Sequence, residues 1–377
     1  MKVLVVAGGG GHFAPALSVL EKFPKDWEVL LVGRKYTFEG DKALSLEHET
    51  AKKLNIPFKD LTTGRLQRKF TRYTIKSLLK VPIGFFQAVG IVRSYKPDVV
   101  LSFGGYVSVP VTFAAFLFRT PIVIHEQTFG AGVANKFVAK YAQKICISWK
   151  ESEKFFPKSK TILTGNPLRQ EFIEYDYKES SGDKTRPLIY ITGGSSGSHA
   201  FNVLIESCVE RLLQKYDIVH QTGDAKKYDD FERLSKLRNG LSDEIKERYM
   251  PVKFVDPGKV ADFLNQADLI VSRSGVNTIT EILYFGKPCL LIPLPYGQQN
   301  EQLTNALFVK DMGLAEVVDQ HKLNSDTFLS LLKSMMENIE KYKIHAPVAK
   351  RLIDPNASQK IVEVLSNVKK KKKFKKT

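Results

Sequence analysis

Cysteine is scarce in this sequence, and the positions of the cysteines indicate neither a disulfide framework nor a metal site. Three cysteines occur among 377 residues, and none of them forms a Cys-x-x-Cys pair. Each one, at Cys146, Cys208 and Cys289, lies in an apolar segment. This pattern excludes a disulfide framework and a zinc finger, and it predicts buried thiols in a reducing compartment.

A long uninterrupted apolar segment is also missing. The residues from 99 to 118 carry no charge and could by length span a bilayer. Gly104, Gly105 and Pro110 divide this segment into a strand, a turn and a helix, so we expect core structure and no transmembrane helix. The apolar run from Val3 to Ala7 is too short for a signal peptide, and none is expected.

Negative charge is in deficit. The chain has 57 Lys and Arg against 40 Asp and Glu, which gives a net charge of +17. Lysines dominate residues 368–377, which are predicted to be a disordered Lys-rich tail. Nucleic acid is one partner for such charge. The sequence has no RRM signature, zinc-finger spacing or basic-zipper heptad, however, so no nucleic-acid partner is expected.

A second basic segment contains no acid between residues 65 and 86 and alternates with apolar side chains. Such mixing suits the surface of an anionic membrane. It also describes an amphipathic helix whose apolar side is core and whose basic side is solvated, and the segment alone favours this second interpretation. The residues concerned are Arg65, Arg68, Lys69, Phe70, Arg72, Ile75, Lys76, Leu79 and Phe85.

The chain opens with an apolar run that ends in four glycines and His12. The run from Lys2 to Ala7 precedes Gly8 to Gly11, and a second strand is predicted from Trp27 to Val32. A dinucleotide-binding βαβ unit would need G-x-G-x-x-G spacing and an acidic residue after the second strand, and both are missing. A nicotinamide-dependent dehydrogenase is therefore disfavoured. Four glycines predict close approach of the backbone to a ligand, which we favour, or a turn that needs positive φ.

Further β-branched runs alternate with glycine-bearing loops and helical patterns. A break near residues 164–169 divides them into two α/β series. In parallel sheets such loops gather at the carboxyl ends of the strands, where ligands bind. The strands are expected at 99–102, 122–124, 145–147, 188–192, 217–221, 252–255, 269–271 and 288–294.

One turn has the features of a phosphate site. An apolar strand ends before Ser274 and Gly275, and a helical pattern follows at once. The unpaired N–H groups and the positive dipole end of such a helix bind phosphate without a metal. Glu281, about two turns into the helix, could accept bonds from ribose hydroxyls. Alternatively, Ser274 caps the helix and Glu281 is a surface acid. An amide-rich loop that ends at Gln302 suits either sugar hydroxyls or a solvated turn.

Taken together and in order, these motifs resemble the MurG family, from Lys2 to about residue 365. Family members are peripheral membrane glycosyltransferases that move N-acetylglucosamine from UDP-N-acetylglucosamine to the muramyl sugar of undecaprenyl-linked lipid I, which makes lipid II. The similar motifs are the glycine run with His12, Gly104 to Ser108, His125 to Gln127, Gly165 to Arg169, Gly193 to Ser195, His220 to Gly223, Arg273 to Gly275 with Thr280 and Glu281, and Gln302 with Asn305.

The resemblance implies the GT-B fold, an α/β architecture of two Rossmann-like domains that face each other across a cleft. It implies an acceptor- and membrane-facing domain at 1–165, a UDP-sugar-binding domain at 166–347, and a last helix at about 348–367 that returns to the first domain. It also implies a peripheral location on the cytoplasmic face of the cell membrane and roles in peptidoglycan synthesis, cell shape, cell division and the cell cycle. The segment from 65 to 86 falls where the family carries its membrane-association patch, which favours the membrane interpretation.

The resemblance also assigns roles to residues. Arg169 and the backbone at Val255 would face the uracil, Glu281 the ribose, and Gln302 the sugar hydroxyls. Ser195 and the turn after Arg273 would hold the diphosphate and sugar, and the glycine run would approach the acceptor diphosphate and the reaction centre. The implied donor-binding set is Gly10, Gly11, Thr128, Arg169, Ser195, Val255, Ser274, Gly275, Val276, Asn277, Thr278, Glu281 and Gln302.

The expected reaction is a single displacement with inversion at the anomeric carbon. A base must take the proton of the attacking hydroxyl, and we expect His12 in this role, with Glu126 as the second choice. The helix start and the glycine loop would stabilise the leaving diphosphate. Because the sequence also has no Asp-x-Asp pair, neither a metal nor another cofactor is expected.

Three departures from the family pattern leave the substrates open. The first glycine loop is one residue shorter than the usual Gly-Gly-Thr-Gly-Gly-His, Thr128 replaces an asparagine near the donor sugar, and Glu301 replaces a histidine. The alternatives are another UDP-hexose, diacylglycerol or another polyprenyl diphosphate as acceptor, a UDP-N-acetylglucosamine 2-epimerase, and a non-catalytic nucleic-acid binder. The acceptor peptide, the lipid length and the oligomeric state also stay open.

Overall fold

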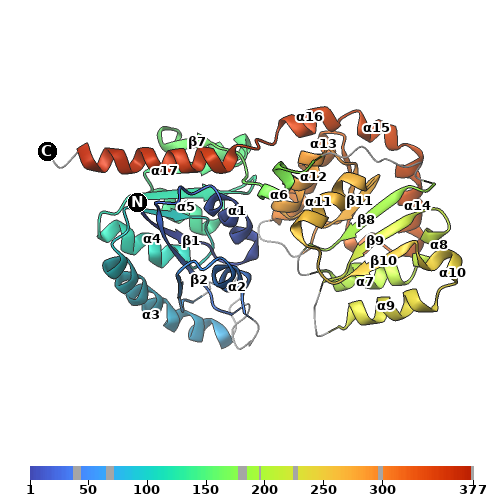
Figure 1. The fold of residues 1–377 in the computed structure, drawn as a ribbon, viewed down its shortest axis with the longest axis horizontal. Coiled ribbons are helices and arrows are strands. Elements are labelled where there is room, and N and C mark those ends of the chain that lie inside the picture. Colours follow the sequence, from blue (N-terminus) through green and yellow to red (C-terminus); the bar gives the residue numbers. More distant parts are fainter. Residues whose placement is uncertain are drawn as a thin grey trace. The chain divides into compact units, whose positions relative to one another are not determined.

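The computed structural model describes residues 1–36, 44–64, 72–176, 185–194, 197–223, 228–295 and 300–374, without the side chains of 72–78, 257 and 369–374. The chain forms two compact units, which Figure 1 colours along the sequence. The N-terminal unit comprises Met1–Arg169 and Asp354–Thr377, and the C-terminal unit comprises Gln170–Ile353. The division near residue 169 lies close to the predicted junction.

The N-terminal unit is built on a seven-stranded parallel sheet with the order β3-β2-β1-β4-β5-β6-β7. Its strands are continuous apolar runs because helices cover both faces of the sheet. The strands are β1 Lys2–Val6, β2 Glu28–Gly33, β3 Phe58–Asp60, β4 Val99–Ser102, β5 Ile122–Glu126, β6 Lys144–Ile147 and β7 Thr161–Leu163.

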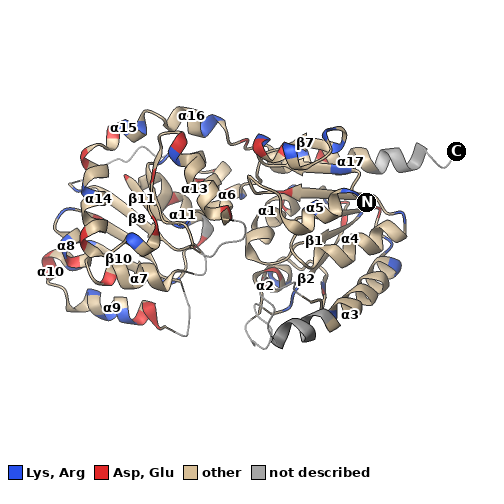
Figure 2. Ribbon diagram, turned by 180° about the vertical axis from the view of Figure 1, so that it is seen from behind, with Lys and Arg blue, Asp and Glu red and all other residues tan. Residues whose placement is uncertain are grey.

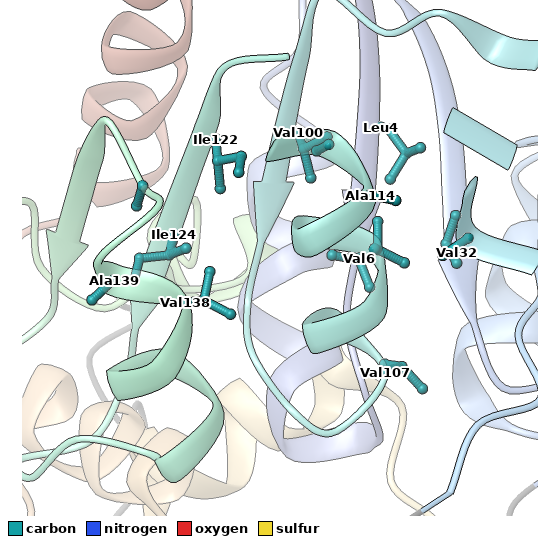
Figure 3. Packing of buried hydrophobic residues seen from close by; sticks show 14 of the residues in the cluster. Leu4, Val6, Val32, Val100, Val107, Ala114, Ile122, Ile124, Val138 and Ala139 are labelled. Atoms are coloured by element: carbon teal, nitrogen blue, oxygen red, sulfur yellow. The ribbon is translucent and has the colours of Figure 1, made fainter. Parts of the chain in front are cut away.

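Alternate residues of β1 serve two hydrophobic cores. Leu4 and Val6 point to one core, which also contains Ala114 and Val138 of the helices (Figure 3). Val3 and Val5 point to the other core, as the two-residue period of a strand requires. The helices of the unit are α1 Gly10–Leu20, α2 Leu46–Lys53, α3 Arg72–Tyr95, α4 Ser108–Leu117, α5 Val133–Ala139 and α17 Ala357–Phe374, with 3₁₀ segments η1 Lys150–Phe155 and η2 Lys158–Lys160.

Helix α17 differs from the prediction at both of its ends. It packs on the second core through Ile361 and Leu365, but it begins at Ala357, because the preceding α16 (Ala346–Arg351) packs on the C-terminal unit instead. It ends at Phe374, whereas the sequence predicts disorder from residue 368. Lysine is a good helix former, and a helix that is already nucleated extends at little cost, which accounts for the difference.

The C-terminal unit repeats the design with a six-stranded parallel sheet in the order β10-β9-β8-β11-β12-β13. The strand order reverses at β8 and β11 here and at β1 and β4 in the N-terminal unit, which are the positions where α/β sheets bind ligands. The strands are β8 Leu188–Thr192, β9 Asp217–Gln221, β10 Tyr249–Val252, β11 Leu269–Ser272, β12 Cys289–Leu291 and β13 Ala315–Val317.

The helices of the C-terminal unit cover both faces of its sheet, and Phe328 and Leu332 of α14 belong to one core. The remaining helices are α6 Gln170–Ile173, α7 His199–Glu206, α8 Val209–Leu213, α9 Asp230–Gly240, α10 Asp243–Lys246, α11 Pro257–Gln266, α12 Val276–Phe285, α13 Glu301–Asp311, α14 Ser325–Glu337 and α15 Ile339–Lys343, with the 3₁₀ segment η4 Gln320–Lys322.

All three cysteines are buried and unbonded, as predicted. Burial raises the pKa of Cys146 and Cys208 to about 12 and also raises that of Cys289, so the thiols stay protonated and unreactive. The uncharged segment from 99 to 118 forms β4, a turn and α4, also as predicted. Along the ranges that the structure describes, no helix is both long and apolar enough to cross a bilayer.

Candidate active site

The glycine run of the N-terminal unit serves three purposes. Gly9 has a φ of 92°, which favours glycine, and it is the N-cap of α1. A Cβ on Gly8 would lie 2.8 Å from a methyl group of Val107 and 3.2 Å from the Cα of Gly105, so two glycine loops approach each other here. Gly10 and Gly11 form the first helical turn, so these two positions bring no side chain to the start of α1.

A buried acid that the sequence did not single out supports this loop. Glu47 of α2 is 1% exposed, and its Oε1 accepts a hydrogen bond of 2.9 Å from the N–H of Gly9. The bond holds the glycine loop in the conformation that starts α1.

His12 lies in the first turn of α1 and is held by backbone and side chain. Its Nδ1 lies 3.0 Å from the carbonyl oxygen of Phe103, and because a carbonyl only accepts, Nδ1 carries the proton. The Gln127 carboxamide approaches the same nitrogen, so its oxygen rather than its nitrogen belongs there, which also gives the otherwise unpaired Oε1 a partner. The imidazole therefore presents Nε2 as an acceptor.

Burial lowers the pKa of His12, and the charge of Glu126 only partly offsets this effect. The imidazole is therefore neutral at pH 7, which is the form that a general base requires. The role of His12 as the base stays a prediction.

The structure does not support Glu126 as an alternative base. This side chain is 1% exposed. One carboxylate oxygen accepts from the N–H and hydroxyl of Thr128 at 3.0 and 2.7 Å, and the other accepts from the N–H of Gly132 and from Asn135 at 2.9 and 3.0 Å. Four donors fill its accepting positions, so Glu126 shapes the loop after β5. The Thr128 hydroxyl is committed to this network as a donor.

In the C-terminal unit, Ser274 has a different role from either predicted one. It is fully buried, and its hydroxyl donates to the carbonyl oxygen of Gln302 at 2.7 Å. Asn305 donates to the carbonyl of Ser274 at 2.8 Å. The N-cap of α12 is Gly275. Ser274 thus neither caps α12 nor faces a ligand with its hydroxyl, but ties the start of α12 to the start of α13.

A pocket of about 420 Å³ opens beside these helix starts. It brings together three of the predicted residues, Gly275, Thr278 and Gln302, with the glycine-rich loop after β8. Glycine is needed in this loop, since Gly197 has a φ of 69° and a Cβ there would lie 2.0 Å from the carbonyl oxygen of Thr222. The lining residues are Gly193, Gly194, Gly197, Ser198, His199, Ala200, Arg273, Gly275, Thr278, Leu294, Pro295, Gln302 and Gln320.

The other predicted donor-binding residues of the C-terminal unit that the structure describes are not among those lining this pocket. Val276 is 6% exposed and its side chain belongs to the core, so only its backbone could bind a ligand. Glu281 lies three residues after Thr278, on the same face of α12. Asn277 and Val255 lie outside the lining, Ser195 lies outside the described residues, and Arg169 ends the N-terminal unit.

Arg273 is a pocket residue to which the sequence assigned no separate role. It is 6% exposed, and its guanidinium donates to the carbonyls of Ile292 and Pro293, to Ser198 at 2.9 Å and to Gln320. The guanidinium also lies over the ring of Phe201. Burial lowers the pKa of Arg273 to about 10, which still leaves it charged at neutral pH.

None of the described carboxylates forms an ion pair with Arg273. A buried cation without a countercharge makes the pocket favourable for an anion. Among the described side chains, no group of three His, Cys, Asp or Glu residues could hold a metal ion.

Comparison with known proteins bears on this site. Residues 3–147 match the N-terminal domain of glycosyltransferase family 28, and residues 188–363 match its C-terminal domain. The chain is 33% identical to "UDP-N-acetylglucosamine--N-acetylmuramyl-(pentapeptide) pyrophosphoryl-undecaprenol N-acetylglucosamine transferase 2" of Bacillus cereus, over 91% of this chain and 94% of that one. It is also 33% identical to the transferase of that name from Geobacter metallireducens, over 99% and 100%.

Solved structures agree on the fold. The crystal structure of Acinetobacter baumannii MurG matches with a TM-score of 0.71 at 25% identity, over 97% of this chain and 100% of that one. A UDP-GlcNAc 2-epimerase from Neisseria meningitidis matches with a TM-score of 0.63 at 16% identity, over 97% and 100%. The latter similarity shows only a shared fold. The predicted α/β class of GT-B type is confirmed.

Proposed function

The chain belongs to glycosyltransferase family 28 and, within it, to the MurG group, and from this premise we infer its reaction. It transfers N-acetylglucosamine from UDP-N-acetylglucosamine to the 4-hydroxyl of the muramyl sugar of undecaprenyl-linked lipid I, which forms lipid II for peptidoglycan. The observation that carries this inference is 33% identity along 91% or more of the chain to transferases of that name. Loss of the activity would therefore disturb cell shape, cell division and the cell cycle.

The donor binds, on this proposal, in the pocket of the C-terminal unit. The diphosphate lies against the start of α12 at Gly275, where the helix dipole and the Arg273 charge both favour an anion. Gln302 binds the sugar hydroxyls, and Glu281 binds the ribose one turn beyond Thr278. Three further members of the predicted set, Arg169, Ser195 and Val255, complete the uracil and diphosphate contacts.

The acceptor is activated by His12. Its Nε2 takes the proton of the attacking hydroxyl. The acceptor oxygen bonds to the anomeric carbon while the bond from that carbon to the UDP oxygen breaks, so an α-linked donor gives a β-linked product. The positive dipole end of α1, at Gly10 and Gly11, suits the acceptor diphosphate. Charge on the leaving UDP is stabilised by fixed dipoles and Arg273, and the reaction proceeds without a bound metal.

A competition assay tests the function. UDP-N-acetylglucosamine and UDP-glucose are offered together, with lipid I and simpler polyprenyl diphosphates as acceptors, with and without EDTA. We expect N-acetylglucosamine on lipid I as the main product and no loss of rate with EDTA. Preferred transfer of glucose, or a manno isomer formed from UDP-N-acetylglucosamine alone, would refute the proposal. A rate that EDTA abolishes and magnesium restores would refute its metal-free part.

The protein acts at the cytoplasmic face of the cell membrane as a peripheral protein, on this proposal. Leu79, Ile83 and Phe86 of α3 are 67%, 50% and 70% exposed, which an ordinary amphipathic helix with its apolar side in the core does not explain. Figure 2 shows that the neighbouring α4 carries no charged residue, and its end adds exposed Phe116 and Leu117.

Cationic side chains flank this apolar surface. Lys136 and Lys154 lie over the ring of Phe155, and Lys140 lies over Phe137. Aromatic rings exposed beside lysines suit an anionic lipid surface. Of the predicted patch, Arg72, Ile75 and Lys76 lie on α3, Phe85 packs on Phe113 of α4, and Arg65, Arg68, Lys69 and Phe70 lie outside the described residues.

A further inference from the structure

One pocket residue of the C-terminal unit has an organised set of neighbours that the proposed reaction does not use. His199 is the first residue of α7 and follows the glycine-rich loop directly. Its Nδ1 lies 2.9 and 3.1 Å from the two carboxylate oxygens of Asp230. The ring stacks on Tyr228, with centroids 3.9 Å apart and planes inclined by 11°. The imidazole is thus fixed both in position and in rotation.

Asp230 determines which nitrogen of His199 faces a ligand. It is 4% exposed and accepts from Asn202 at 2.7 Å and from Arg233 at 2.8 Å. Burial raises the pKa of Asp230, but the bonds from Asn202, His199 and Arg233 outweigh it, so the net pKa is below its usual value. The carboxylate is ionised and only accepts. Nδ1 of His199 therefore carries a proton, and Nε2 is the nitrogen available to a ligand.

Nε2 has no hydrogen-bond partner in the part of the chain that the structure describes. Neither of the two arginines described nearby has a terminal nitrogen left to donate to a ligand in place of Nε2. Arg273 uses its terminal nitrogens on Ile292, Pro293, Ser198 and Gln320. Arg233 is bound to Glu206 and Asp230. Arg273 thus gives the pocket charge, and His199 is the lining side chain with an uncommitted ring nitrogen.

We propose that His199 binds the diphosphate of the nucleotide and that its imidazole takes up one proton from solvent as the nucleotide binds. Nε2–H then donates to a phosphate oxygen, and no covalent bond changes. A bound diphosphate on one side of the ring and Asp230 on the other both favour the imidazolium. Glu206 and Arg233 face this cluster as a pair and largely neutralise each other.

The inference rests on the proposed donor site and adds a proton to it. When the bond to the sugar breaks, the leaving UDP gains negative charge, so a contact from an imidazolium strengthens in the transition state. His199 would then contribute to turnover as well as to nucleotide affinity.

Calorimetry tests the inference. The full-length protein and its His199→Gln variant are titrated with UDP and with uridine, each in two buffers that differ in ionisation enthalpy. We expect the variant to bind UDP about tenfold more weakly, because a charge-assisted bond is lost, and to bind uridine as the parent protein does. Proton uptake with UDP should be present in the parent and absent in the variant. His345→Gln, a histidine of the same unit outside the pocket lining, is the matched control and should change neither value.

A second measurement does not depend on the variant. Nitrogen NMR of the histidine rings in the parent protein should show the His199 signals moving to the doubly protonated pattern with UDP but not with uridine. An unchanged pattern with UDP bound, or equal UDP affinity in His199→Gln and the parent, would overturn the inference while leaving the transferase proposal intact. Failure of the parent protein to bind UDP at all would overturn both.

Discussion

His12 shows how the surroundings of a residue set its protonation state. Burial lowers its pKa, whereas the negative charge of Glu126 raises it, and burial is the larger effect. A bond to the Phe103 carbonyl fixes the proton on Nδ1. The result is a neutral ring with a defined acceptor, which is the arrangement that a base near neutral pH requires.

We predict that His12→Ala lowers kcat by about 10² to 10⁴ and leaves UDP affinity unchanged. Because the base must be deprotonated and its pKa is lowered, parent activity should hold at neutral pH and fall only below the usual pKa of histidine, near 6.5. Activity against pH is the measurement, and His321→Ala on the protein surface is the control. Near-normal turnover in His12→Ala, with lipid I as acceptor, would remove His12 from this role.

For Glu126 we predict an effect on stability rather than on catalysis. Its carboxylate oxygens accept four hydrogen bonds from the fold itself. Glu126→Gln puts an amide N–H₂ against donors such as the N–H of Thr128 or Gly132, and an unpaired buried donor costs about 1–3 kcal/mol. The free energy of unfolding should fall by this amount in a denaturant titration. Glu151→Gln, on the surface of the same unit, should change it little. A fully stable but inactive Glu126→Gln would favour the catalytic role over the structural one.

The sequence could nominate His12, Gly275 and Gln302 as site residues because each belongs to a local motif. It could not show that the Ser274 hydroxyl donates to the carbonyl oxygen of Gln302 in α13, because that partner lies 28 residues away. The sequence likewise could not show the hydrogen bonds of Arg273 or of Glu47, whose partner Gly9 is 38 residues away. Such pairings are set by the packing of elements, not by local pattern.

The elements themselves were largely predictable. Both sheets are covered on two faces, so their strands are short apolar runs between polar loops. Each sheet contains a hydrogen bond to an aspartate that the sequence pattern did not predict. Asp98 precedes β4 and accepts from the N–H of Lys2, and Asp268 precedes β11 and accepts from the N–H of Leu188. The same device therefore joins the two central strands in each unit.

The exposed apolar residues of α3 are predicted to enter the lipid. Replacing Leu79 and Phe86 together by glutamine should reduce binding to anionic vesicles by at least tenfold, because two exposed apolar side chains, each worth about 1.5–3 kcal/mol when fully buried, no longer enter the lipid. Vesicle flotation is the measurement. Turnover with a detergent-dispersed acceptor should persist. Ile344→Gln, which removes a side chain 69% exposed in the other unit, should not affect flotation, and unchanged flotation of the double variant would contradict the membrane surface.

For the whole molecule, the division into two units follows from the break near residue 169, and the break is visible in the sequence. The return of the last helix was expected from family resemblance rather than from pattern. Its start was misplaced because α16 and α17 are separate helices that pack on different units. No periodicity shows which sheet an amphipathic helix will cover.

The lysine-rich C-terminal tail supplies part of the net charge of +17. Deletion of residues 369–377 removes the lysine cluster but keeps Val368, which is the last residue of α17 whose side chain is described and is buried, so the fold should survive. Each lysine near an anionic surface contributes about 1 kcal/mol at low salt, and the Debye length shrinks to about 3 Å at 1 M salt. The deletion should therefore weaken vesicle binding at low salt and have little effect at high salt, whereas the Leu79 and Phe86 replacements weaken it at both. Flotation across a salt series, with DNA binding measured in parallel, separates the two contributions. If the deletion abolished DNA binding and left vesicle binding unchanged at every salt concentration, the tail would serve a nucleic acid rather than the membrane.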